Sequence, residues 1–152
     1  MVMSLSLPGD FSDGALALMA VGTLSALAAI AHLACIAIGP AAYRFMGAGE
    51  RMARAVEAGR AAPTLATLAI AAMLSVWSLY AFSGAGLVGR LPFTGLVLAA
   101  ISVVCLARAV AFPLLRPVFP QNSTTFWLVS SAICLVLGLL YAIGAVAVWR
   151  ET

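Results

Sequence analysis

Long apolar runs separated by short polar stretches dominate the chain. A helix needs about 20 apolar residues to cross a hydrocarbon core of about 30 Å. Runs of this kind predict spanning helices at about residues 14–38, 63–82, 92–112 and 124–149. They leave little sequence for a soluble domain. We therefore expect an all-α polytopic membrane protein, a single membrane domain over residues 1–152, folded as a bundle of four antiparallel transmembrane helices.

Helix-breaking and helix-capping residues fit these boundaries. Gly39, followed by proline, ends the first run. Pro63 and Pro92 open the second and third runs, because a proline has no N–H to lose in the first helical turn. Pro113 stops the third run, and Ser123 is a good N-cap for the fourth. The connections between spans should be short, apart from a loop at residues 39–62.

The composition agrees with a membrane protein. Apolar residues make up 64% of the chain and charged residues only 9%, against about 45–50% apolar residues in soluble domains. A cleaved signal peptide needs a positively charged start, and no Lys or Arg precedes Phe11. We therefore expect the first apolar run to stay in the mature protein.

The arginines predict the orientation of the chain, which contains no lysine. One side of the predicted bundle carries Arg44, Arg51, Arg54, Arg60 and Arg116, and the other carries Arg90 and Arg150. Loops rich in basic residues stay in the cytoplasm. This asymmetry predicts a multi-pass protein of the cell inner membrane, with loop 39–62 in the cytoplasm and both termini in the periplasm.

Within the cytoplasmic loop, residues 50–58 have the pattern of a short helix. Glu50 and Arg54 are spaced to form an ion pair on one face, and Gly59 is a natural stop. One interpretation is an interfacial helix lying on the headgroups, with its arginines toward anionic lipid. The other is a loop that binds a substrate or a partner. The candidate interaction residues of this loop are Glu50, Arg51, Arg54 and Glu57.

His32 and Arg108 are the ionisable side chains that fall well inside the predicted spans, at similar depth near the cytoplasmic side. Such residues are hypotheses about function, because burying charge in a bilayer is unfavourable. Together with the nearby Arg44, they form a candidate site for an anion or a lipid headgroup. The alternatives are that Arg108 snorkels to the interface and that His32 bonds to a backbone carbonyl or hydroxyl. No Asp or Glu lies between Ala58 and Arg150, which argues against proton-coupled transport.

The three cysteines, Cys35, Cys105 and Cys134, each fall in a different apolar run. Without a C-x-x-C pair, they are expected to behave as small inert hydrophobes. The sequence contains no nucleophile triad, phosphate loop or cluster of metal ligands, so we assign no catalytic residue, no metal site and no cofactor. Membrane lipids are the expected partners, with a homo-oligomer or a larger membrane complex also possible and no nucleic acid.

At Gly47–Ala53, Leu79–Gly86 and Asn122–Ser131, the chain resembles small uncharacterised four-helix proteins of the bacterial inner membrane. The likeness covers nearly the full length. It implies a bacterial origin and the same four-helix architecture.

A second resemblance is to the membrane-associated eicosanoid and glutathione metabolism (MAPEG) family, whose members are trimers of four-helix chains. Arg51, Arg54 and Ala55 match the start of the family's R-x-x-R-A-x-x-N-x-x-E glutathione motif, and Arg108 matches the arginine of a later R-x-x-x-Y motif. The chain departs from these motifs at three positions, with Ala58 for Asn, Ala61 for Glu and Phe112 for Tyr. The resemblance implies a glutathione-dependent membrane enzyme.

From the sequence we therefore expect an integral membrane protein that is not an enzyme and that acts as an accessory or interaction component of the bacterial inner membrane. The alternatives are a MAPEG-like glutathione-dependent enzyme and a small oligomeric transporter or lipid-binding protein.

Overall fold

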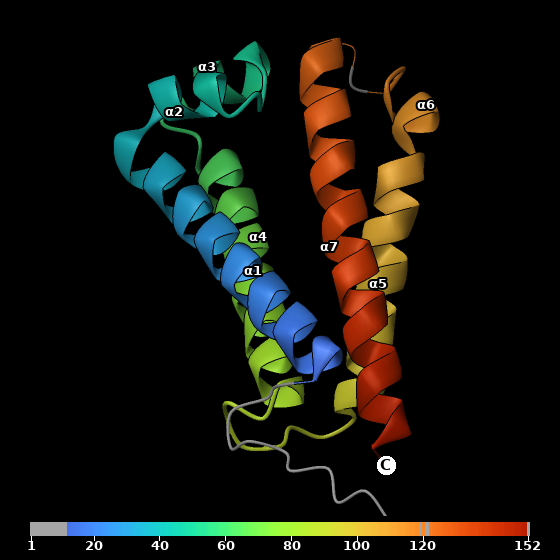
Figure 1. Ribbon diagram of the computed structural model, residues 1–152. Coiled ribbons are helices and arrows are strands. Elements are labelled where there is room, and N and C mark those ends of the chain that lie inside the picture. Colours follow the sequence, from blue (N-terminus) through green and yellow to red (C-terminus); the bar gives the residue numbers. More distant parts are fainter. Residues whose placement is uncertain (1–11, 119, 121, 152) are drawn as a thin grey trace, which may run out of the picture.

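The computed structural model describes residues 12–118, 120 and 122–151, and over these residues all regular structure is helical. The elements in chain order are α1 (Asp13–Ile38), α2 (Pro40–Phe45), α3 (Glu50–Glu57), α4 (Ala61–Gly84), α5 (Thr94–Val110), α6 (Phe112–Leu115) and α7 (Thr124–Arg150) (Figure 1). The predicted all-α class is confirmed. Helices α1, α4 and α7, with 26, 24 and 27 residues, are long and apolar enough to cross a membrane.

Two serines begin α1 and α7 as N-caps. The Ser12 Oγ accepts a hydrogen bond from the Ala15 N–H at 3.2 Å, and the Ser123 Oγ accepts one from the Phe126 N–H at 3.0 Å. Each bond satisfies an N–H that has no partner inside the helix. The predicted spans 14–38 and 124–149 therefore match the helices to within one residue at each end.

Helix α5 is shorter than predicted. The sequence favours a span over residues 92–112, but the helix starts at Thr94, after Phe93 in the left-handed region at φ 56°, and ends at Val110. Pro113 explains the early end, because its ring clashes with the carbonyl four residues upstream, which belongs to Ala109. The chain then resumes as α6. With 17 residues, α5 is at the lower limit of about 17 residues for a span.

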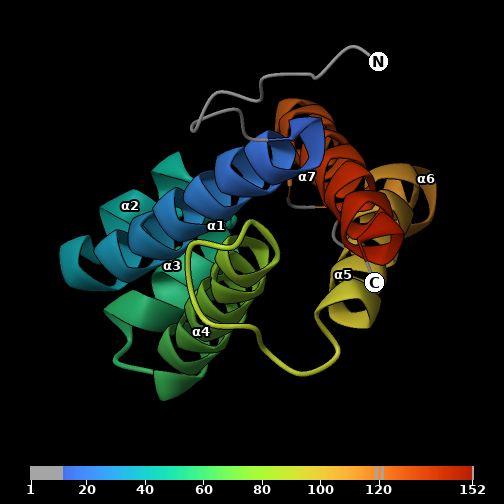
Figure 2. The same ribbon diagram turned by 60° about the horizontal axis from the view of Figure 1, so that its bottom comes forward.

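The four long helices form two hairpins, α1 with α4 and α5 with α7, whose helices alternate in direction along the chain (Figure 1). The hairpins meet at the end that holds the start of α1 and the end of α7. They separate toward the end that carries α2, α3 and α6. Figure 2 shows the same arrangement with the lower end turned forward and α1 beside α7, and α4 also contacts α5.

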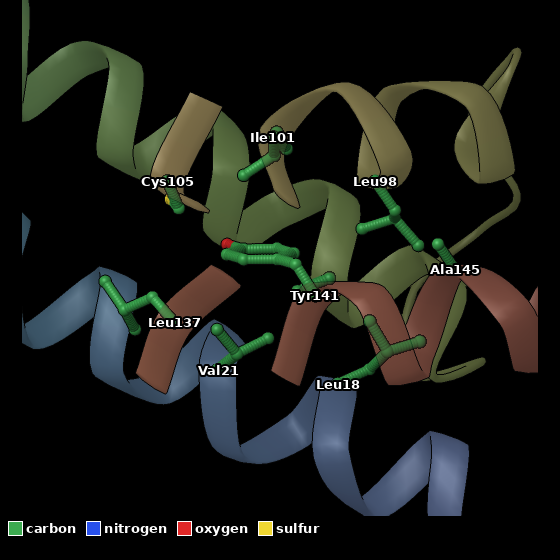
Figure 3. Close-up of a cluster of buried hydrophobic side chains, with 9 residues drawn as sticks. Leu18, Val21, Leu98, Ile101, Cys105, Leu137, Tyr141 and Ala145 are labelled. Carbon is green, nitrogen blue, oxygen red and sulfur yellow. The ribbon is translucent and has the colours of Figure 1, made fainter. Parts of the chain in front are cut away.

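A core of buried side chains forms where the hairpins meet (Figure 3). Its members are Leu18, Val21, Ala81, Leu98, Ile101, Cys105, Leu137, Tyr141 and Ala145. Leu18 of α1 occupies space left by two glycines, Gly84 of α4 and Gly144 of α7, because a Cβ added at either glycine would meet its side chain. Helices in lipid associate through such close approach at small residues, since no hydrophobic force acts between them.

Serine hydroxyls add hydrogen bonds between the helices. Ser78 of α4 donates to the Gly22 carbonyl of α1, and Ser102 of α5 donates to the Gly138 carbonyl of α7, both at 2.8 Å. Glycine lets the serine approach its carbonyl, because no side chain covers the helix surface there. Gly138 itself lies against Leu106 of α5.

The outward faces of the long helices carry exposed apolar side chains. They include Leu16, Leu24, Leu27, Ile30, Leu65, Leu68, Met73, Val76, Leu128, Ile133, Leu139 and Ile143. A soluble monomer rarely exposes so much contiguous apolar surface. The faces are as expected for helices that pack against lipid.

Candidate functional site

The segment that follows α1 folds into a cap of two short helices, α2 and α3, at the end where the hairpins separate (Figure 1). Gly59 ends α3 with φ 69°, a conformation that favours glycine. The Arg60 N–H then bonds back to the Ala55 carbonyl at 2.9 Å and covers a carbonyl at the end of the helix. The predicted helix at residues 50–58 and its stop at Gly59 are confirmed.

The cap is attached to α1 and α4 by its own apolar side chains. Ala53 of α3 lies in a buried cluster with Cys35, Ala42 and Tyr43, against which Met52 and Val56 pack. The Tyr43 hydroxyl donates to the Thr67 hydroxyl at 3.0 Å, and the Thr67 hydroxyl donates to the Pro63 carbonyl at 2.9 Å. The apolar face of α3 therefore packs inside the protein.

Ion pairs hold the two helices of the cap together. The Arg44 guanidinium bonds to both Glu50 carboxylate oxygens, at 2.8 and 3.0 Å, and to Glu57 at 2.7 Å. Arg54 Nε donates to Glu50 at 3.1 Å, which confirms the predicted i,i+4 pair. The hydrogen bonds from Arg44 and then Arg54 lower the pKa of Glu50 from 4.5 to about 2, and the two carboxylates raise the pKa of Arg44.

An open hollow of about 540 Å³ lies on the outer side of the cap. Its lining residues are Glu50, Arg51, Arg54, Ala55 and Arg60. Arg51 and Arg54 project from one face of α3, and Arg60 directly precedes α4. Three of the four predicted loop residues thus line one hollow, while Glu57 bonds to Arg44 outside it. Arg60, which the sequence singled out only for orientation, completes the lining.

Arg108 lies in the last turn of α5, where its charge is favourable beside the helix dipole. Its Nη2 donates to the Ser130 hydroxyl of α7 at 3.1 Å, and its guanidinium carbon lies 4.8 Å from the centre of the Trp127 ring. Nη1 is buried without a hydrogen-bond acceptor among the described residues. These contacts make Arg108 a connection between α5 and α7. Nothing in the sequence marked Ser130 or Trp127 as its partners.

The three residues of the predicted anion site each have separate partners. His32 Nδ1 lies 2.7 Å from the Ala28 carbonyl of its own helix, which agrees with the alternative interpretation of this histidine. Arg44 binds Glu50 and Glu57 in the cap. Over their described residues, the backbones of α1 and α5 do not approach each other closely, so His32 and Arg108 lie on helices that are not paired. Anion binding by these residues stays a prediction.

Cys35, Cys105 and Cys134 are free thiols, the first two buried. Among the described residues, no three His, Cys, Asp or Glu side chains come close enough to hold a metal ion. The fold is that of a helical membrane protein. No family model, curated protein or solved structure matches the chain.

Proposed function

We propose that the chain is an integral protein of the bacterial inner membrane that is not an enzyme and acts as an accessory or interaction component through its α2–α3 cap. In this proposal α5 is the fourth spanning helix, beside α1, α4 and α7. The cap lies in the cytoplasm and both termini lie in the periplasm.

The observation that carries the proposal is the construction of the cap. Its apolar residues and ion pairs are used internally to fix α2 and α3 on the ends of α1 and α4. Arg51, Arg54 and Arg60 remain exposed on its outer side. A fixed, charged surface of this kind is suited to binding a partner. The end with α2, α3 and α6 holds five arginines, against two in the α4–α5 connection and at the end of α7, which favours a cytoplasmic cap.

Reporter fusions test the orientation. Alkaline phosphatase fused after Arg60 is expected to be inactive and the same enzyme fused after Thr152 active, because it folds only in the oxidising periplasm. A fluorescent reporter that requires the cytoplasm provides the matched control and should give the opposite result. Strong phosphatase activity from the fusion after Arg60 would contradict the proposed topology.

Purification in mild detergent tests the interaction role. The tagged parent chain is expected to elute with a larger complex, and Arg51→Glu with Arg54→Glu should reduce that complex at least tenfold by reversing the charge of the cap surface. The matched control is Arg90→Glu with Arg150→Glu, which reverses two charges at the other end and should leave the complex intact. A parent chain that elutes alone after cross-linking would refute an accessory role.

The same parent chain and charge-reversal variants also test the alternative of a glutathione-dependent enzyme. Arg51 and Arg54, which match the start of the MAPEG motif, both line the hollow. Retention of the parent on immobilised glutathione, lost on reversing these two charges and kept in the Arg90 and Arg150 control, would favour an enzyme over an accessory protein.

A further inference from the structure

Three guanidinium groups share the hollow on the cap with the Glu50 carboxylate, which already binds Arg44 and Arg54. Both Glu50 oxygens accept hydrogen bonds from Arg44, and one also accepts from Arg54. Arg51 and Arg60 form no ion pair with any described residue, and both are exposed. The hollow therefore has an excess of positive charge. Planar guanidinium groups bind phosphate through paired N–H donors, which makes a phosphate group the best-matched ligand.

The hollow lies at the start of a helix that is long enough to cross the membrane. Arg60 is the residue before α4, one of the three helices of spanning length. Just beyond it, Leu65 and Leu68 are 62% and 49% exposed. Residues 61, 65 and 68 follow the i, i+4, i+7 spacing of one helix face, so an apolar stripe runs from the hollow along α4. The arginines of the hollow match the charged phosphate of a phospholipid, and the apolar stripe on α4 matches its acyl chains.

We propose that this hollow is a binding site for an anionic phospholipid, with the phosphate between Arg51, Arg54 and Arg60 and an acyl chain along Leu65 and Leu68. The site differs from the one predicted at Arg108, His32 and Arg44. It requires only that the chain lies in a membrane with its cap at one surface, so it stands whether or not the cap also binds a protein.

Native mass spectrometry of the full chain in detergent tests the site, with added phosphatidylglycerol or phosphatidylcholine as probes. The parent is expected to retain phosphatidylglycerol preferentially. The Arg51→Gln, Arg60→Gln double variant should retain about 25-fold less, because each basic residue near an anionic lipid surface contributes about fivefold. Neither substitution removes an ion pair of the cap. Circular dichroism of this variant should match that of the parent.

The matched control is Arg90→Gln with Arg150→Gln, which removes the same charge at the other end and should change retention less than twofold. Equal losses in the two double variants would refute the site, as would full retention by the Arg51 and Arg60 variant. Inorganic phosphate in large excess should not displace the lipid, because the acyl chain contributes to binding. Displacement by phosphate alone would overturn the lipid assignment and indicate a site for a soluble anion.

Failure of this test is distinguishable from failure of the proposed function. Lipid retention is measured on the isolated chain, whereas the interaction role is measured by the complex that elutes with it. A parent chain that retains no phosphatidylglycerol but elutes with its complex would reject the lipid site alone, and a parent chain that retains the lipid but elutes without a complex would reject the accessory role alone.

Discussion

The Gly144→Leu variant is expected to separate the two hairpins. Any Cβ at this position would overlap the side chain of Leu18, which is 1% exposed and also lies against Gly84. Overpacking of a core costs about 1–3 kcal/mol, and a leucine adds three further carbons where the first has no room. We expect a loss of at least about 3 kcal/mol in the free energy of unfolding, and little folded protein after extraction.

Thermal unfolding in detergent, followed by tryptophan fluorescence and size-exclusion chromatography, measures this effect. Gly89→Leu is the control, because nothing lies within 4 Å of a Cβ added at that exposed glycine. The control should unfold within a few degrees of the parent. An unchanged unfolding temperature for Gly144→Leu would show that the hairpins do not pack as described.

The Tyr141→Ala variant is expected to lose about 3–5 kcal/mol of stability, the usual cost of removing a buried aromatic ring. The Tyr141 side chain is 0% exposed, packs edge-on against Trp77 and bonds to the Ser25 hydroxyl at 2.9 Å. It therefore connects α7 with both helices of the first hairpin. Unfolding by sodium dodecyl sulfate, titrated against a mild detergent, measures the loss.

Two further variants divide this loss between packing and hydrogen bonding. Tyr141→Phe and Ser25→Ala each remove the hydrogen bond and keep most of the packing, so each should cost about 0.6 kcal/mol and at most about 1.7. Combining them should cost little more than either alone, because both remove the same bond. If Tyr141→Phe cost as much as Tyr141→Ala, the ring would not be packed as the structure has it.

Local signals predicted the long helices well. Apolar length marked α1, and Ser123 also marked the start of α7, so both helices were placed to within one residue at each end. Pro63 marked α4 less sharply, because proline fits several positions of a first turn, and the helix begins two residues earlier at Ala61. Pro113 was seen as a stop, but its steric effect acts upstream of the ring and shortened α5.

The contacts between helices could not be predicted from the sequence. The spacing of Met52 and Val56 shows that α3 has an apolar face, but not whether lipid or protein covers it, and the structure covers it with Tyr43 and its neighbours. Arg108 and Ser130 are 22 residues apart with no motif to link them. The sequence singled out the arginines of the hollow by their charge. Only the fold shows that Arg60 lines the same hollow as Arg51 and Arg54.

The pairing of helices into hairpins has a consequence for biogenesis. The bond between Ser78 and Gly22 joins residues 56 apart, and that between Ser102 and Gly138 joins residues 36 apart, whereas Ser25 and Tyr141 are 116 apart. Translation delivers the N-terminal helices first. Each hairpin can therefore assemble during insertion, while the seam between α1 and α7 must wait for the last helix to leave the ribosome. Until then, the side of Leu18 that Gly144 later covers lies open to lipid.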